Sequence, residues 1–150
     1  SFGTVFEPRG EVVAGFAHRI APPGDDSAGH DYRALVCRVD ADGNEVAGIR
    51  LPDVAVPLAT LTGWNAYRPP YPAGEITDRD GSCLAFAPDE VARQACGDPR
   101  PSIARRYRDR DDYVRRVRAA AQALVDERLM LPDDAEACIE RARRDPRLGG

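Results

Sequence analysis

Helical periodicity is confined to the C-terminal part of this chain, and this restricts the folds open to it. Val114, Val117, Ala121 and Leu124 recur at the spacing that places them on one face of a helix. No comparable pattern precedes residue 102, where strand-like and proline-rich stretches occur instead. Strands followed by helices favour an α+β fold over an alternating βαβ arrangement.

Residues typical of helix ends mark the boundaries of the helices within residues 102–145. Ser102 is expected to cap a short helix that runs through Tyr107. The acidic run 109–112 lies where a helix dipole favours negative charge, so the next helix is expected to start there and end near Arg128. Pro132 suits the first turn of a final helix, whose apolar face is predicted to be Ala135, Cys138, Ile139 and Ala142.

Residues 32–51 have the pattern of a β-hairpin. Side chains alternate from Tyr32 to Val39, and strand-forming residues resume from Glu45 to Leu51. The intervening residues 40–44 read Asp-Ala-Asp-Gly-Asn, whose Asx side chains and glycine favour a tight turn. We therefore predict a hairpin or small antiparallel sheet here.

The remaining segments lack strong periodicity. Residues 1–31 are predicted to be an extended arm, and residues 52–101 a largely irregular segment rich in proline and glycine. Within the latter, a short apolar patch at residues 83–86 and a helical turn from Asp89 to Ala95 are expected. The 150 residues fit a single domain or a fragment of one, and the first residue, Ser1, is consistent with processing or with excision from a longer chain.

Composition excludes several functions. All 21 basic residues are arginine, so Schiff-base and P-loop lysines are absent from this sequence. The net charge is −4, which argues against general nucleic-acid binding. No run of about 20 apolar residues is present, so no membrane span is expected. No cofactor is implied by any motif.

No residue stands out as a catalytic nucleophile or base. The strand-to-helix elbow of a serine hydrolase requires small residues around the serine, usually as G-x-S-x-G, and the sequence has no such motif. Ser82 follows Gly81 but is expected to lie in a loop. His18 and His30 can titrate near neutrality, but both occur in the weakly patterned arm, where a surface or structural role is favoured.

Metal sites are not predicted either. Cys37, Cys83, Cys96 and Cys138 form no C-x-x-C pair, so free thiols are expected, with a disulfide left open. The acidic run 40–44 resembles the start of a calcium loop, but Glu45 and Leu51 occupy the positions that need glycine and a bidentate glutamate. A turn is the favoured interpretation.

Arginine is dense between Arg100 and Arg118, where aspartates alternate with it. Ion pairs on a solvated helical face are the favoured explanation. Capture of an anion by some of the guanidinium groups is the alternative.

Several segments, in order, resemble one protein family. They are residues 39–52 (VDADGNEVAGIRLP), 54–60 (VAVPLAT), 62–65 (TGWN), Gly81-Ser82, 97–102 (GDPRPS) and the helix that contains Tyr113. Together they resemble the C-terminal portion of bacterial α/β-hydrolase domain-containing proteins, and the resemblance covers roughly residues 32–145.

The resemblance implies a hydrolase whose serine nucleophile lies upstream of the matched region, so no catalytic residue transfers to this chain. We therefore expect a non-catalytic segment with a structural or substrate-cleft-lining role, partnered by the upstream hydrolase region. Trp64, Asn65 and Tyr67 are the candidate binding residues. The alternatives are a stand-alone ligand-binding or interaction domain that forms a homodimer or other homo-oligomer, and a small enzyme that uses His18 or His30.

Overall fold

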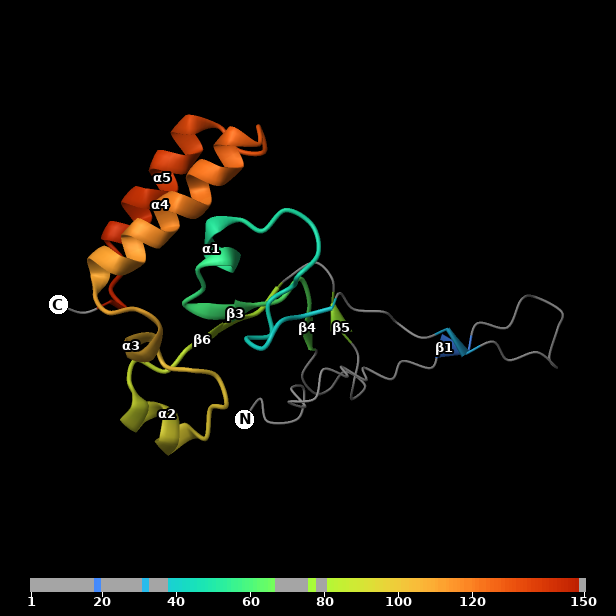
Figure 1. Ribbon diagram of the computed structural model, residues 1–150. Helices are drawn as coiled ribbons and strands as arrows, with labels where there is room; N and C mark the ends of the chain where they lie inside the picture. The colour runs from blue at the N-terminus through green and yellow to red at the C-terminus, as the bar shows by residue number, and fades with distance from the viewer. Residues whose placement is uncertain (1–17, 20–30, 33–37, 67–75, 78–80, 149–150) are drawn as a thin grey trace, which may run out of the picture.

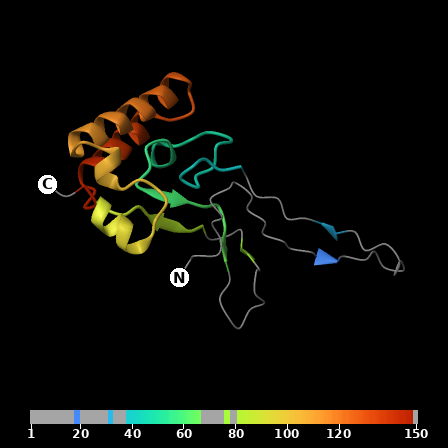
Figure 2. The same ribbon diagram turned by 60° about the horizontal axis from the view of Figure 1, so that its bottom comes forward.

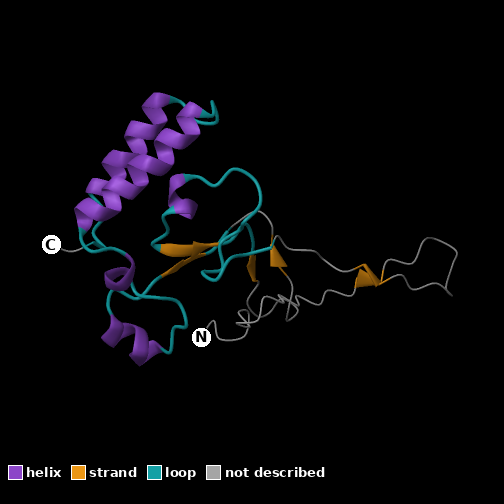
Figure 3. Ribbon diagram, in the orientation of Figure 1, coloured by secondary structure: helices purple, strands orange, loops and turns teal. Residues whose placement is uncertain are grey.

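The computed structural model describes residues 18–19, 31–32, 38–66, 76–77 and 81–148. The elements are β1 (His18–Arg19), β2 (Asp31–Tyr32), α1 (Pro52–Ala55), β3 (Ala59–Leu61), β4 (Asn65–Ala66), β5 (Ile76–Thr77), β6 (Cys83–Ala85), α2 (Glu90–Cys96), α3 (Ile103–Arg106), α4 (Arg110–Asp126) and α5 (Pro132–Arg143). Short strands precede the long helices, as Figures 1 and 3 show. The predicted α+β class is confirmed.

The strands form two-stranded antiparallel sheets: β1 with β2, β3 with β6, and β4 with β5. In the β3–β6 sheet, Thr60 pairs with Leu84, flanked by Ala59 with Ala85 and Leu61 with Cys83. This sheet joins the proline-rich middle of the chain to the segment that leads into α2, and Figure 2 shows it between the helices and the β4–β5 pair. A small antiparallel sheet was predicted, but its location differs from the expected one.

The predicted turn at residues 40–44 is present. One carboxylate oxygen of Asp40 accepts hydrogen bonds from the backbone N–H groups of Asp42 (2.9 Å) and Asn44 (3.0 Å). The strands expected on either side are reduced to one bridge, between Val39 and Glu45. Residues 33–37 lie outside the described residues.

The second arm of the predicted hairpin is not a strand, although residues 46–51 are all described. Gly48 has a φ of 74°, in the left-handed region, and this turns the chain away from an extended course. Val46, Ile49 and Leu51 are 41%, 56% and 48% exposed, so their alternation does not form a buried face. The alternation of apolar and polar residues therefore predicted a second strand at residues 45–51 that the backbone does not form.

The buried amide of Asn44 completes the sheet on the side of β3 that faces away from β6. Its Nδ2 donates to the carbonyl oxygen of Ala59 (3.1 Å), and its Oδ1 accepts from the N–H of Leu61 (2.8 Å). These are the bonds that an adjacent strand would make. Asn44 is fully buried, and the turn at residues 40–44 is thereby fixed against the sheet.

The proline-rich middle is mostly irregular, as predicted, but it contains α1 and β3. Pro52 occupies the first turn of α1, where its missing N–H costs nothing. The expected helical turn after Asp89 is α2, and the side chain of Asp89 accepts a hydrogen bond from the N–H of Ala92 (2.8 Å). Side-chain capping thus defines this helix, as it does α4.

The predicted helices of the C-terminal part are confirmed as α3, α4 and α5, with α4 capped by Asp109. Ser102 lies at the position preceding α3, but it does not cap that helix through its side chain. Its hydroxyl instead donates to a carboxylate oxygen of Glu90 in α2 (2.8 Å), so it joins two helices.

Helices α4 and α5 form an antiparallel pair, visible in Figures 1 and 2 as the helical layer beside α1. Val117, Ala121 and Leu124 of α4 are buried, as are Ala135, Ile139 and Ala142 of α5. Arg110 ties the two ends together because its guanidinium donates to the carbonyl oxygens of Arg143 (2.5 Å) and Leu148 (2.7 Å). No helix in the described ranges is long and apolar enough to cross a membrane.

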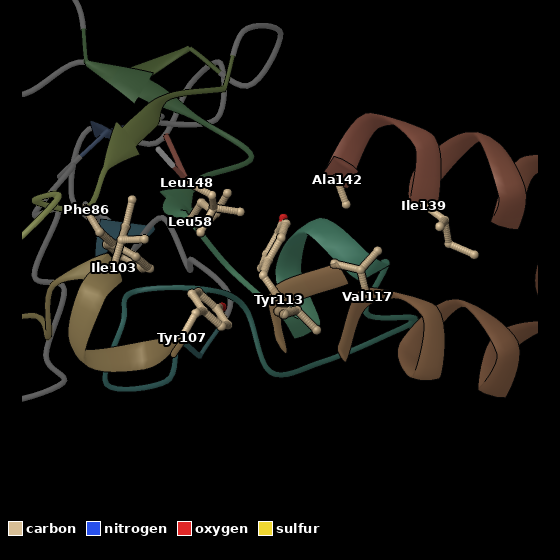
Figure 4. Packing of buried hydrophobic residues seen from close by; sticks show 10 residues of the cluster. Leu58, Phe86, Ile103, Tyr107, Tyr113, Val117, Ile139, Ala142 and Leu148 are labelled. Carbon is tan, nitrogen blue, oxygen red and sulfur yellow. The ribbon is translucent and has the colours of Figure 1, made fainter. Parts of the chain in front are cut away.

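One hydrophobic core connects the helical pair to the β3–β6 sheet (Figure 4). Its members include Leu58 and Phe86 beside the sheet, Ile103 in α3 and Tyr113 in α4. The Tyr107 hydroxyl donates to the carbonyl oxygen of Pro57 (2.8 Å), and its ring meets that of Tyr113 edge-on, with centroids 5.0 Å apart. Burial raises the pKa of Tyr107 to about 12. Both phenols are therefore neutral packing elements near neutral pH.

Replacing Asn44 with Ala is expected to lower the free energy of unfolding by about 1–3 kcal/mol, because a buried carbonyl and a partly buried N–H lose their partners. Urea denaturation monitored by circular dichroism measures the change. The matched control is Gln94→Ala on an exposed part of α2, expected within about 0.5 kcal/mol of the unsubstituted chain. Equal stability of the two variants would contradict a structural role for the Asn44 amide.

Candidate functional site

The candidate binding residues lie where β3 gives way to β4. Trp64 and Asn65 are both half-buried, and Asn65 begins β4. Tyr67 lies outside the described residues. The structure thus brings Trp64 and Asn65 to one turn, which we call the Thr62–Asn65 turn, while their role in binding remains a prediction.

Hydrogen bonds hold the Thr62–Asn65 turn against the segment that precedes β6. The N–H of Thr62 donates to the carbonyl oxygen of Ser82 (3.0 Å), and the N–H of Ser82 donates back to the Thr62 hydroxyl oxygen (3.0 Å). The Thr62 hydroxyl in turn donates to the carbonyl oxygen of Trp64. The backbone that carries Trp64 is therefore fixed by its neighbours rather than by its own side chain.

Gly81 is required by this close approach. A Cβ atom built at Gly81 would lie 2.1 Å from the carbonyl oxygen of Thr62, closer than two nonbonded atoms can come. Only glycine allows the two segments to meet at this distance. The Gly-Ser pair in the sequence thus has a packing function.

The surroundings of Ser82 do not resemble those of an activated nucleophile. Its hydroxyl lies 3.5 Å from the carbonyl oxygen of Trp64, to which it donates. In the described part of the chain, no histidine or carboxylate hydrogen-bonds to it, and such a base is what activates a serine. Of the two histidines, His18 lies in β1 and His30 falls outside the described residues.

Two arginines pack on the ring of Phe86, which lies at the other end of the β3–β6 sheet from this turn. The guanidinium carbons of Arg100 and Arg106 lie 4.9 Å and 4.1 Å from the ring centroid. Arg100 donates to Asp98, to the hydroxyl of Thr60 (2.7 Å) and to the carbonyl oxygen of Leu84 (3.0 Å). Its position therefore links the loop before α3 to both strands of the β3–β6 sheet.

Arg106 links α3 to the turn at residues 40–44. It makes a two-pronged ion pair with Asp42, in which Nη1 lies 2.7 Å from one carboxylate oxygen and Nη2 contacts the other. Both side chains are largely buried, at 14% and 18% exposure. Residues 64 positions apart in the sequence are thus joined by one bidentate contact.

The solvated-face interpretation of the arginine run is therefore wrong for Arg100 and Arg106. Each fork already binds an aspartate of this chain, and so these two groups are structural. Hydrogen bonding to Arg100 lowers the pKa of Asp98 below its usual value. Exposed pairs such as Arg108 with Asp109 do fit the prediction.

Metal binding finds no support in the described ranges, where no group of His, Cys, Asp or Glu is arranged to hold an ion. Asp40 bonds to Arg50 and to backbone N–H groups, and Asp42 pairs with Arg106, so the acidic turn is internally neutralised. Cys83, Cys96 and Cys138 are free thiols, and Cys37 lies outside the described residues.

Comparison with known families identifies the class of protein. The family described as an alpha/beta hydrolase domain matches residues 12–140. The chain therefore belongs to this family, as the sequence segments had indicated. The match begins at residue 12, whereas the recognised segments began near residue 32, and so residues 12–31 also belong to the family region. No curated protein and no solved structure matched the chain.

Sequence reasoning missed the two interactions that organise the site. Asn44 was interpreted as turn chemistry alone, and Arg106 as part of a solvated run. Neither residue carries a local signal of these contacts. A signal was available for the neighbouring Arg100, which stands between two prolines and two residues after Asp98 in the sequence GDPRPS at residues 97–102. Fixed backbone on both sides of a long cation indicates a positioned guanidinium.

Arg106→Ala is expected to lower the free energy of unfolding by about 3 kcal/mol, because it leaves the largely buried Asp42 carboxylate without its partner. Arg105→Ala, on the exposed side of the same helix, is the matched control and should change stability by less than about 0.5 kcal/mol. Chemical denaturation of both variants at pH 7 measures the difference. Arg106→Lys should recover only part of the loss, since lysine lacks the planar fork.

The Asp98–Arg100 pair predicts an acid limit to stability. Because the folded pKa of Asp98 is lowered, its contribution is present in full above the unfolded pKa of about 4 and is lost as pH falls through the folded value. Denaturation midpoints of the unsubstituted chain should therefore fall between pH 5 and pH 2. Asp98→Asn should be less stable at pH 7 and should show a shallower pH dependence. If stability falls with pH in the same way in both proteins, the Asp98–Arg100 pair is not the cause of the acid limit.

Proposed function

We propose that this chain is a non-catalytic segment of an α/β hydrolase, which supports the fold and lines the substrate cleft through Trp64 and Asn65, while another region of the protein supplies the nucleophile. The family match supports the hydrolase class. The observation that carries the proposal is the state of Ser82, whose hydroxyl is bonded to a backbone carbonyl with no base beside it among the described residues.

Exposed apolar side chains favour a segment over a self-sufficient domain. Val46, Ile49 and Leu51 lie within one short loop and are 41–56% exposed, and Val91 on α2 is 79% exposed. Grouped exposed apolar residues are typical of surfaces that another polypeptide covers. A stand-alone binding domain would instead be expected to bury them.

The architecture of the Thr62–Asn65 turn supports the lining role. Its backbone is held by Thr62 and by Ser82, so the Trp64 side chain is not needed for that frame. When the backbone is already ordered before a ligand binds, less conformational entropy is lost on binding. The lining role is therefore proposed for Trp64, with Asn65 as its neighbour in the same turn.

The test uses hydrolysis of p-nitrophenyl esters by the 150-residue chain and by the protein expressed from the complete open reading frame that encodes it. The chain alone is expected to show no turnover above buffer, and the complete protein is expected to be active. In the latter, Trp64→Ala should raise KM about tenfold with little change in kcat, because an apolar contact made equally in the ground and transition states is lost. Gln94→Ala is the control, because Gln94 is exposed on α2 and remote in sequence from the turn.

Two outcomes would contradict the proposal. Turnover by the isolated chain that His18→Ala, His30→Ala or Ser82→Ala abolishes would make it an enzyme in its own right. An unchanged KM in Trp64→Ala, with the fold intact by circular dichroism, would remove the lining role and leave only the structural one.

A further inference from the structure

The two edges of the β3–β6 sheet differ, and the difference follows from which backbone groups point inward. The N–H of Thr62 donates to Ser82, and the N–H of Phe86 donates to Leu58. Since hydrogen-bonded and non-hydrogen-bonded pairs alternate in an antiparallel ladder, the even-numbered residues of both strands bond to each other. The odd-numbered residues of both strands therefore direct their backbone groups outward.

On β3 the outward backbone groups are hydrogen-bonded. The carbonyl oxygen of Ala59 and the N–H of Leu61 both bond to the buried Asn44 amide. That edge is closed to a further strand by a side chain of the same chain.

On β6 the outward groups belong to Cys83 and Ala85, both of which are exposed. The carbonyl oxygen of Ala85 has one long contact, 3.4 Å from Arg100 Nη2. Within the described ranges, the N–H groups of Cys83 and Ala85 have no partner in the pattern set by the ladder. Among the residues that the structure describes, the β3 edge of the sheet is thus closed and the β6 edge is open.

We propose that the outer edge of β6, residues Cys83–Ala85, pairs with a β-strand from the catalytic region of the same hydrolase, which extends this sheet. The inference rests on the proposed function, because it requires that such a region exists. An unpaired edge strand is a template for strand addition.

The size of the edge decides between a tethered strand and a second copy of the chain. Stable association of separate molecules buries about 800 Å² on each partner, and a three-residue edge covers only a small part of that area. A strand in the same polypeptide binds at high effective concentration and needs no such area. The small side chains of Cys83 and Ala85 also leave room on their face for large apolar residues of the incoming strand.

Residue-resolved amide hydrogen exchange tests the pairing in the isolated chain and in the protein from the complete open reading frame. The N–H groups of Cys83 and Ala85 are expected to exchange rapidly in the chain alone, at any concentration, and at least tenfold more slowly in the complete protein. The inward N–H groups of Thr60 and Leu84 are the internal control and should be protected in both.

Two substitutions to proline, at neighbouring positions of β6, provide a second test. Ala85→Pro removes an outward N–H, so the isolated chain should keep its denaturation midpoint, whereas the complete protein should lose thermal stability. Leu84→Pro, one residue away, removes an inward N–H and should destabilise the isolated chain as well.

Three results would overturn the inference. The first is equal exchange of the Cys83 and Ala85 N–H groups in the two proteins, and the second is protection in the isolated chain that rises with concentration, which would indicate a second copy. The third is an open reading frame that encodes only the 150 residues of this chain. Esterase activity of the isolated chain would refute the proposed function but would not alter the exchange result, so the two failures are distinguishable.

Discussion

The side-chain amide of Asn44 occupies the place of a missing β-strand, and much of the described structure depends on this. Its two bonds to β3 fix the turn at residues 40–44 against the sheet. That position in turn brings Asp42 within reach of Arg106, and the carbonyl oxygen of Asp42 within reach of the Thr60 hydroxyl. A buried amide satisfied on both sides is costly to disturb, because each partner would be left unbonded in the interior.

Arginine performs the long-range connections in this chain. Arg106 joins α3 to the turn at residues 40–44, Arg100 joins the loop after α2 to both strands of the β3–β6 sheet, and Arg110 joins the start of α4 to the end of α5. Each uses several guanidinium N–H groups at once, which an ammonium group cannot reproduce with the same geometry. The absence of lysine from the sequence is compatible with this use, since the fixed fork suits carboxylates and carbonyl oxygens alike.

These connections pair several charged groups of the chain with one another, while some apolar side chains remain exposed to solvent. The carboxylates of Asp42 and Asp98 are paired with arginines, whereas the side chains of Val46, Ile49, Leu51 and Val91 are exposed to solvent. Exposed apolar side chains of this kind are typical of surfaces that another polypeptide covers. They are the reason for the proposal that this chain is one segment of a larger hydrolase.

The sequence by itself determined the α+β class, the helices of the C-terminal part, the tight turn at residues 40–44 and the hydrolase family. These are set by local periodicity, by capping residues such as Asp109 and by short recognisable segments. Only the tertiary structure decided which strands pair, and which arginines are structural. Strand pairing depends on contacts between β3 and β6, more than 20 residues apart, and the placement of Arg106 depends on a carboxylate 64 residues away. No local pattern encodes either contact, because each joins residues that are far apart in the sequence and meet only in the folded structure.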